Sequence, residues 1–287
     1  MGRIRIGVSG WNYDSWRGAF YPTGLPRSRQ LEEIGRRFSS VEINGSFYAL
    51  LKPETYRTWH AATPRDFVFA VKGSRFITHN KKLRDARTPL ANFLASGVLA
   101  LGEKLGPIVW QLPERLAYDR ERLERFLDLL PHDHRAAARL ARRHDRRLKG
   151  RSSFAVERNH RLRHALEVRN ESYFHSEFVG LLRRAGVALV CSDSADWPRR
   201  TELTAGFVYV RLHGSRTTYA SRYPDAELAD WARRIRSWRA GRQLRDAERI
   251  TRRAPPRRKS RDVYVYFDND RHAHAPRDAQ QLIARIR

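Results

Sequence analysis

Eight short apolar runs recur along the chain, and most of the stretches between them carry helix signals. The runs are rich in β-branched and aromatic residues, which is typical of strands buried on both faces of a sheet. They are Ile4–Val8, Val41–Ile43, Phe67–Val71, Ile108–Trp110, Ala165–Val168, Val187–Val190, Phe207–Leu212 and Val263–Phe267. Strands that alternate with helices predict a parallel sheet, and eight such units close naturally into a barrel.

The helix signals are caps, prolines in a first turn, and amphipathic stripes. Ser28 and Thr88 are candidate N-caps, and Pro89 follows Thr88 at the first helical position. Gly186 is a good stop for the helix before it. Helices are therefore expected at about 28–38, from Pro53 onward, and at 88–105, 120–130, 175–185, 225–238 and 277–286. The stretch 193–206 looks irregular.

These patterns predict an α/β fold of the TIM-type (β/α)8 class, somewhat irregular, with residues 1–287 in a single domain. The alternative is an open doubly wound sheet. The barrel is favoured because no G-x-G-x-x-G fingerprint follows the first strand and the chain has no phosphate-loop lysine motif.

The formal net charge of +26 suits a polyanionic partner. Residues 142–151 hold six Lys or Arg and one Asp, and residues 239–261 hold ten against Asp246 and Glu248. Both segments run from a helix into the next strand, so in a barrel they would lie at the amino ends of the strands, away from the active face. Nucleic acid bound through these two segments is one expectation, and solvated basic loops are the alternative.

A single cysteine, Cys191, excludes an internal disulfide and a cysteine-rich zinc site. The N-terminal sequence MGRIRIGVSGW enters a strand-like run almost at once, without the apolar stretch of a leader peptide. No run of about 18 apolar residues occurs, so no membrane partner is expected. We therefore expect a cytoplasmic protein.

Charged and polar residues end most of the apolar runs, and in a barrel the loops at those carboxyl ends form the active face. A charged residue inside an apolar run is costly to bury unless it is paired or functional. Five such residues are Glu42, Lys72, Glu167, Arg169 and Arg211. They predict a site for a polar ligand, with groups that can exchange protons.

Residues near these strand ends fall into two predicted roles. The predicted catalytic residues are Glu42, Glu167, Lys72 and His213. The predicted ligand-binding residues are Trp11, Asn44, Tyr48, His79, Gln111, Arg169, Arg211, Asp268, Asn269 and Asp270. A divalent metal ion is an open expectation, because carboxylates and a histidine at strand ends could hold one and nothing in the spacing decides the matter.

These residues also have structural interpretations. The charges can form a network that caps the barrel, with Glu167 paired to Arg211 and Glu42 to Lys72. His213 alone is more typical of a hydrogen-bonded strand end than of a base. Residues 268–270 are as typical of a turn as of a cation site.

Seven motifs together carry a family resemblance. IGVSGWNYDSWRGAFYP, FSSVEINGSFYAL, FVFAVKGSRFITH, GPIVWQLP, HALEVRNESY, FVYVRLHG and VYVYFDNDRHAHAP resemble the YecE-like family, domain of unknown function seventy-two. The resemblance covers nearly the whole chain and implies a TIM-type barrel without an assigned reaction. It also marks 132–163 and 239–261 as elaborations. The family usually has arginine and histidine after the fifth-strand glutamate, but Arg169 is followed here by Asn170.

Three functions remain open at this point. The first is an enzyme, such as a hydrolase or an isomerase or lyase, that acts on a small polar molecule, anionic or polyhydroxylated. The second is a nucleic-acid-associated protein that binds through the basic segments. The third is a barrel that binds a ligand without turning it over. Salt-dependent binding would mark the second function, and turnover would separate the first from the third.

Overall fold

The computed structural model describes residues 1–286, in which strands and helices alternate as in a TIM-type (β/α)8 barrel. The predicted α/β fold class is therefore confirmed. The chain forms two compact units: unit 1 comprises Met1–Glu42 with Tyr173–Arg287, and unit 2 comprises Ile43–Ser172. The expectation of a single domain stays a prediction.

Each of the eight predicted apolar runs contains a strand, and the ends differ by three residues at most. Within residues 1–286 the strands are β1 (Ile4–Val8), β2 (Ser40–Ile43), β3 (Val68–Lys72), β4 (Leu105–Gln111), β5 (His164–Glu167), β6 (Ala188–Asp193), β7 (Phe207–Leu212) and β8 (Asp262–Phe267). They are buried almost throughout, which explains why they read as continuous apolar runs.

The sheet of unit 1 is parallel, with β6, β7, β8 and β1 in that order. Phe267 pairs with both Val8 and Leu212, so β1, β7 and β8 end at the same level. A bridge between Ser9 and Glu42 places the end of β2 beside the end of β1. The polar residues at the carboxyl ends of β1, β2, β7 and β8 therefore lie close together.

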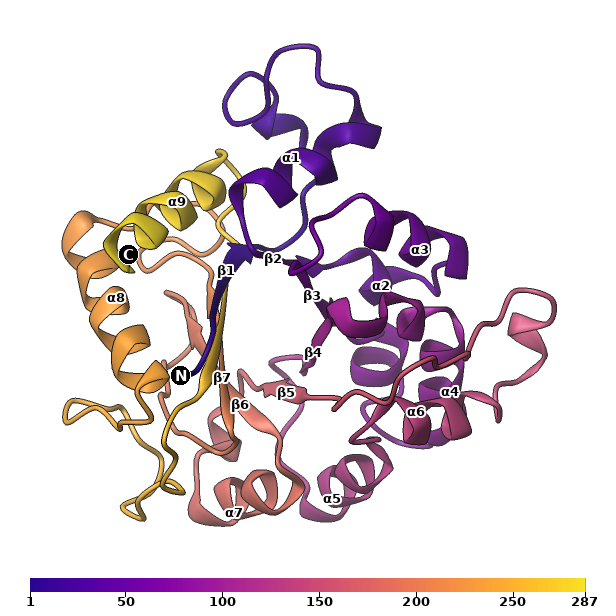
Figure 1. Cartoon of the computed structure of the whole chain (residues 1–287). Helices are drawn as coiled ribbons and strands as arrows, with labels where there is room; N and C mark the ends of the chain where they lie inside the picture. The colour runs from indigo at the N-terminus through magenta and orange to yellow at the C-terminus, as the bar shows by residue number, and fades with distance from the viewer. Residues whose placement is uncertain (287) are drawn as a thin grey trace. The chain divides into compact units, whose positions relative to one another are not determined.

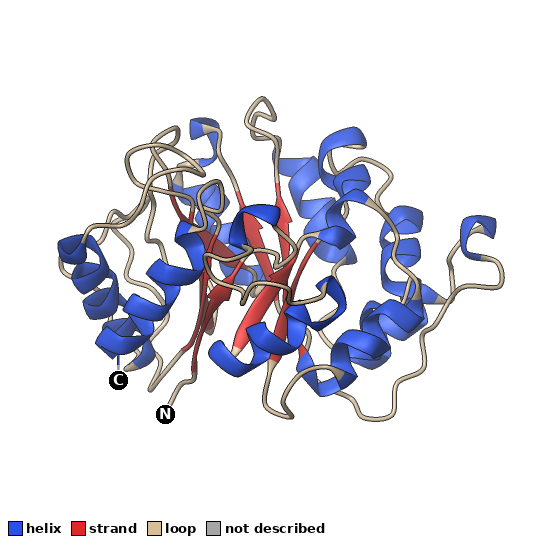
Figure 2. Ribbon diagram, turned by 90° about the horizontal axis from the view of Figure 1, so that it is seen from above, coloured by secondary structure: helices blue, strands red, loops and turns tan. Residues whose placement is uncertain are grey.

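Helices cover one face of the unit 1 sheet. α9 (His274–Ile286) packs on β1 and β8, α8 (Asp225–Arg239) packs on β8, and α7 (Ser176–Ala185) packs on β6 (Figures 1 and 2). The close approach of β2 requires Gly7, because a Cβ there would lie 1.9 Å from the carbonyl oxygen of Ser40. Unit 1 also holds η1 (Asp14–Trp16), η2 (Arg27–Arg29) and α1 (Gln30–Arg37).

The sheet of unit 2 consists of β3, β4 and β5, all parallel. Lys72 pairs with Val109, and Gln111 pairs with Glu167, so three of the predicted site residues end strands of one sheet. The helices of this unit are α2 (Gly45–Tyr48), α3 (Pro53–Ala61), η3 (Phe76–Asn80), α4 (Arg87–Ala95), η4 (Val98–Lys104), α5 (Arg120–Leu129), α6 (His134–Ala141) and η5 (Arg146–Leu148). The short η6 (Glu171–Tyr173) follows at the junction.

Most of the predicted helices are present, but two predicted caps are wrong. Pro53 opens α3, and α7 ends at Gly186 in a left-handed conformation with φ of 64°. Ser28 lies inside η2 and makes no cap bond, while Thr88 is the second residue of α4. The helix expected to reach 105 stops at Ala95, because Gly97 turns the chain with φ of 115° against Pro53.

The stretch 193–206 was expected to be irregular: Asp193 ends β6, and residues 194–206 hold neither helix nor strand. The helices of residues 1–286 are all too short or too polar to cross a membrane.

Candidate functional site

Arg211 of β7 is the centre of a buried polar cluster in unit 1. Its Nη2 donates to Glu42 Oε1 at 2.9 Å, to Asp268 Oδ2 at 2.8 Å and to Ser9 Oγ at 3.2 Å. The side chains of Arg211 and Glu42 are fully buried. Tyr209 donates its hydroxyl to Glu42 Oε2 at 2.6 Å. We call Ser9, Glu42, Tyr209, Arg211 and Asp268 the Arg211 cluster.

His213, which follows β7, is held between a carboxylate and two aromatic rings. Its Nδ1 lies 3.0 Å from Asp268 Oδ2. Trp197 and Tyr219 meet the imidazole edge-on, with ring centroids 5.3 and 5.4 Å away. The carboxylate orients the ring as in an acid–base dyad. Because the side chain is fully buried beside Asp268, this geometry favours the interpretation of a packed strand-end histidine.

The turn after β8 brings together two carboxyl groups with different environments. Asp268 contacts the Arg211 guanidinium, whereas Asp270 is buried beside it. Burial, and then the charge of Asp268, raise the pKa of Asp270 well above its usual range. Asn269 is fully buried and donates to the Ser221 carbonyl and to Asp278 Oδ2, both at 2.9 Å. The turn is thus anchored through Asn269, and burial at Asp270 favours the protonated form of its carboxyl.

A second group of polar residues lies in unit 2, where Lys72 ends β3. The Lys72 ammonium lies 4.4 Å from the centre of the Phe47 ring, and its carbonyl accepts a hydrogen bond from Ser46 at 2.7 Å. The Phe47 ring also meets the His79 ring edge-on at 5.2 Å. Phe47 therefore joins Lys72 to His79, and both of these side chains are half-buried.

His79 lies in η3, a single turn of π-helix, and such turns occur frequently at functional sites. Its Nδ1 lies 2.9 Å from the Thr78 hydroxyl. Burial, and then the positive charges of Lys72, Arg75 and Arg169, lower the pKa of His79 to about 4. The imidazole is therefore neutral at pH 7 and able to accept a proton.

Glu167 and Arg169, which end β5 and follow it, form an ion pair. Arg169 donates from Nε and Nη2 to Glu167 Oε1 at 3.0 and 2.9 Å. Glu167 is fully buried, while 14% of the Arg169 side chain is exposed. Gln111 donates its amide to the Leu112 carbonyl at 2.9 Å beside them. A buried carboxylate therefore fixes a guanidinium near the surface. We call Lys72, His79, Gln111, Glu167 and Arg169 the Lys72 cluster.

The structure shows which cation accompanies each of the two buried carboxylates, Glu42 and Glu167. Glu42 pairs with Arg211 and Glu167 pairs with Arg169, so each of the two buried carboxylates has a cation from its own unit. Both pairs are within hydrogen-bond distance, as buried charges require. The catalytic roles predicted for Glu42, Glu167, Lys72 and His213 stay predictions.

Three further predicted contact residues lie close to the strand ends. Trp11 is partly exposed in unit 1, and its carbonyl accepts the Tyr21 hydroxyl at 2.6 Å. Asn44 is partly buried and precedes α2. Tyr48, at the end of α2, is 74% exposed and meets the Phe47 ring at 5.0 Å. Tyr48 thus lies next to the Lys72 cluster with a ring available to a ligand.

Residues 1–286 contain no group of three or more His, Cys, Asp and Glu side chains arranged to hold a metal ion. Of the two carboxyl groups in the turn after β8, Asp268 pairs with Arg211, and burial raises the pKa of Asp270.

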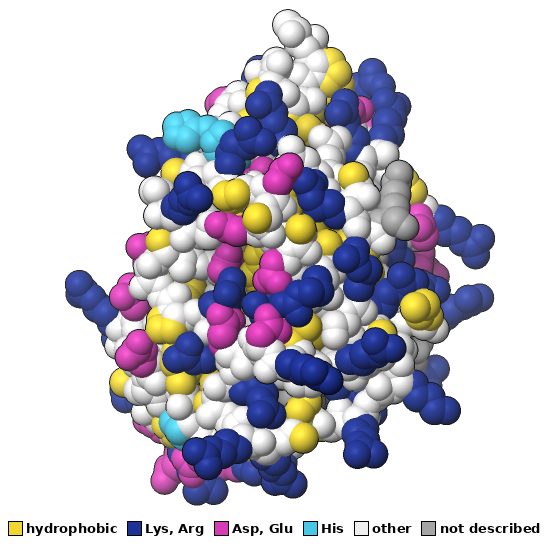
Figure 3. All heavy atoms as spheres, turned by 90° about the vertical axis from the view of Figure 1, so that its left-hand side faces the viewer, with side chains coloured by type: hydrophobic (Ala, Val, Ile, Leu, Met, Phe, Trp, Pro, Cys, Tyr) yellow, Lys and Arg dark blue, Asp and Glu magenta, His cyan; other side chains and the backbone are white. Residues whose placement is uncertain are grey.

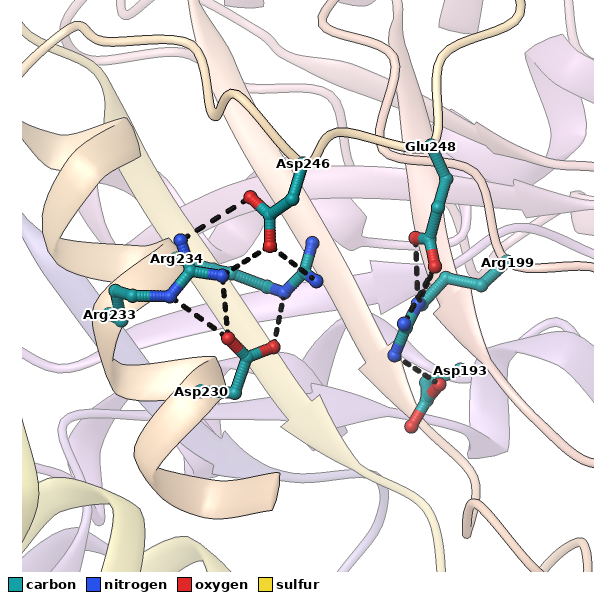
Figure 4. Close-up of polar contacts among 7 residues, drawn as sticks. All are labelled: Asp193, Arg199, Asp230, Arg233, Arg234, Asp246 and Glu248. Atoms are coloured by element: carbon teal, nitrogen blue, oxygen red, sulfur yellow. Dashed lines mark hydrogen bonds and ion pairs between the residues drawn. The ribbon is translucent and has the colours of Figure 1, made fainter. Parts of the chain in front are cut away.

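The acids of the basic segment 239–261 tie it to the rest of unit 1 (Figure 4). Asp246 accepts from two arginines of α8 at 2.5 and 3.3 Å. Glu248 accepts three bonds of 2.7–3.0 Å from Arg199, which also donates to Asp193 at the end of β6 at 3.2 Å. The segment joins α8 to β8 as predicted, but it turns back along α8. The segment was predicted to lie away from the carboxyl ends of the strands, but through Arg199 it is linked to Asp193 at the carboxyl end of β6.

The basic residues of 239–261 are mostly exposed. The eight exposed ones are Arg242, Arg245, Arg249, Arg252, Arg253, Arg257, Arg258 and Lys259. Figure 3 shows Lys and Arg side chains spread over the face seen there, with acidic side chains gathered near its middle.

Two polar residues of unit 1 escaped the sequence analysis. Tyr209 stands two positions before Arg211, so strand alternation places both on one face and a signal was present. Arg199 lies in the irregular stretch, and its partners Asp193 and Glu248 are 6 and 49 residues away in the sequence. No spacing pattern identifies such a bridge.

Comparisons with known proteins agree with the fold. The family described as "Protein of unknown function DUF72" matches residues 5–287. The UPF0759 protein YecE of Escherichia coli K12 is 33% identical over 45% of this chain and 44% of its own length, and the UPF0759 protein YunF of Bacillus subtilis is 31% identical over 28% and 27%. The chain thus spans less than half the length of these curated relatives. Crystal structures of DUF72 family proteins from Thermotoga maritima (TM-score 0.72, 21% identity, 98% of both chains) and Enterococcus faecalis (0.67, 17%, 99% and 95%) share the fold.

Proposed function

The chain belongs to the DUF72 family, and on that premise we propose that it is an enzyme that acts by acid–base catalysis on a small anionic molecule bound at the Lys72 cluster. The observation that carries the proposal is the grouping of two cations and a neutral imidazole around the Phe47 ring and the buried Glu167. A titratable group whose pKa is perturbed by burial and by specific charged neighbours, as that of His79 is, is typical of catalytic sites.

Lys72 and Arg169 are the groups that would hold the substrate. The Lys72 ammonium is half-buried, and the Arg169 guanidinium is fixed by Glu167 with part of its surface exposed. A guanidinium that is held in place loses little freedom when it binds a carboxylate or phosphate. Two neighbouring cations therefore favour an anionic ligand over a neutral one.

His79 is the group that would move the proton. It is neutral at pH 7 because its pKa is about 4, and the Thr78 hydroxyl at 2.9 Å from Nδ1 orients the ring. As a base it would take a proton from the substrate or from an attacking water. A bound anion that offsets the charges of Lys72 and Arg169 would raise the pKa of His79 toward the working pH, where a base is most effective. Lys72 and Arg169 would then stabilise the negative charge that develops on the substrate. Proton abstraction of this kind serves hydrolases and isomerases or lyases alike.

The two other predicted catalytic residues, Glu42 and His213, are fully buried in the Arg211 cluster and its neighbourhood. Their burial supports a structural role in unit 1. We further propose that the protein acts in the cytoplasm, since its one cysteine, Cys191, is buried and free.

Isothermal titration with inorganic phosphate, sugar phosphates and dicarboxylates tests the binding half of the proposal. Lys72→Met and Arg169→Met should each weaken binding at least about tenfold, because each removes a charged partner of the anion. Lys52→Met, an exposed lysine of the same unit, is the matched control and should bind as the parent does. Equal affinity in all four proteins would exclude this site.

NMR in D2O tests the proposed proton transfer. If His79 takes a proton from a substrate carbon, the C–H signal of a bound dicarboxylate or sugar phosphate should disappear as deuterium replaces the proton. If His79 activates water, a hydrolysis product should appear. His79→Gln should retain binding and lose this turnover. Binding without turnover of any panel compound by the parent protein would instead favour a ligand-binding barrel.

A further inference from the structure

A groove in unit 2, lined by none of the residues of the Lys72 cluster, carries arginines of one helix face. α6 carries Arg135 and Arg139, and Arg142 follows its last turn, so the spacing of four and three places all three on one side. Their side chains are exposed. Within residues 1–286 no carboxylate forms an ion pair with any of them. Successive arginines lie about 6 Å and about 4.5 Å apart along the helix axis.

The opposite wall of the groove is the extended segment 152–156. Ser153 is anchored at its backbone, where the amide donates to the Ala95 carbonyl at 2.8 Å, and at its hydroxyl, which accepts from Arg57 at 3.3 Å. Phe154 projects its ring under the Arg142 guanidinium, 5.7 Å away, and meets His144 at 6.2 Å. The two walls enclose about 670 Å³, which is within the range of small-ligand clefts.

Positive charge continues beyond the groove. Residues 142–151 hold six Lys or Arg, and their one acid, Asp145, already caps η5 and lies 3.8 Å from Arg147. One or two cations are enough to bind a small anion, whereas the groove and residues 142–151 carry a row of them. A phosphate backbone with one negative charge per nucleotide matches such a repeat.

The aromatic wall favours a single strand over a duplex. An unpaired base can leave its stack and lie against an aromatic ring, whereas bases in a duplex remain stacked on one another. Segment 239–261 carries a larger net positive charge, but it contains no aromatic residue. The two basic segments therefore differ in what they can recognise.

We propose that the groove of Arg135, Arg139, Arg142 and Phe154 is a binding site for single-stranded nucleic acid. The three guanidiniums contact successive phosphates, and the Phe154 ring packs on a base beside Arg142. This site is independent of the Lys72 cluster and of the reaction proposed for it.

Fluorescence anisotropy with labelled oligothymidylate and oligouridylate of about 12 nucleotides, at about 50 and about 200 mM salt, tests the proposal. The triple variant Arg135→Gln/Arg139→Gln/Arg142→Gln should raise Kd at least about thirtyfold. It should also lower the slope of log Kd against log salt by about 2, since each phosphate contact in a single strand contributes about 0.7. The matched control Arg252→Gln/Arg257→Gln/Arg258→Gln removes the same charge from exposed positions of 239–261 and should change Kd by less than about threefold.

Phe154→Leu separates base stacking from charge. It should raise Kd for the oligonucleotides about tenfold, as loss of one stacked base does, and leave the binding of inorganic polyphosphate unchanged. Thermal melts confirm that each variant is folded. The proposal is overturned by any of four results: no binding at low salt, equal losses in the two triple variants, an unaltered Kd in Phe154→Leu, or tighter binding of the matching duplex.

Discussion

Replacing Arg211 with methionine leaves two carboxylates without their shared cation. Glu42 and Asp268 each lose a charge-assisted hydrogen bond, of 2.9 and 2.8 Å, and Glu42 is fully buried. Such a bond contributes about 1.5–3 kcal/mol, and removing one partner of a buried ion pair costs about 3–5 kcal/mol. Tyr209 still donates to Glu42, which keeps the loss within that range. We therefore expect Arg211→Met to lower the free energy of unfolding by about 3–5 kcal/mol.

Urea unfolding at pH 7 measures this loss, and an exposed pair provides the control. Arg125 pairs with Glu121 at 3.0 Å, close to the distances of the Arg211 pairs, but 80% and 78% of the two side chains are exposed. Arg125→Met should therefore cost less than about 1 kcal/mol. Adding Glu42→Gln to Arg211→Met should recover part of the loss, because a neutral amide replaces the unpaired carboxylate. Equal losses in Arg125→Met and Arg211→Met would refute the argument that burial sets the magnitude.

Other predictions concern unfolding free energies measured in the same way. Burial lowers the pKa of His164 to about 4. Between about pH 4 and 6.5 the unfolded chain therefore binds more protons at this residue than the folded chain does. The free energy of unfolding should for this reason fall by about 2 kcal/mol as the pH drops from 7 to 5. His164→Gln should reduce that slope, while His272→Gln, at an exposed position, should retain it. Gly7→Ala should cost at least about 2 kcal/mol, because its Cβ would overlap the backbone of β2, whereas Gly206→Ala has open space and should be nearly neutral. Asp119→Ala removes the side chain that caps α5 and should cost about 1 kcal/mol.

The strands were predictable because their apolar character is local. Both faces of β4 and β7 are buried, so the run Phe207–Leu212 is visible without knowledge of its neighbours. Helix ends were less predictable. Thr88 has the residue type of an N-cap, but α4 begins at Arg87, and the same helix stops early because Gly97 must pass close to Pro53. A cap preference of about 1 kcal/mol is easily outweighed by such packing.

The positions of the site residues were predictable, whereas their partners were not. A charge inside an apolar run marks Glu42 and Arg211 as exceptional, and the barrel rule places both at strand ends. The pair itself joins residues 169 positions apart in the sequence. By charge alone, Lys72 could equally pair with Glu42 and Arg211 with Glu167, so residue type does not choose among these combinations. Distance in the folded chain decides which cation offsets which buried carboxylate.

The two histidines of the predicted site show why residue type does not determine role. His213 follows a strand and lies 3.0 Å from a carboxylate, which is the pattern expected of a base, but Trp197 and Tyr219 close around it. Trp197 comes from the irregular stretch 193–206 and Tyr219 from the loop after β7, so neither contact has a periodic signal. His79 looks like a loop residue in the sequence, and the π-helical turn holds it half-buried against Phe47. Burial, which arises from segments without regular pattern, therefore makes His79 the better candidate for proton transfer.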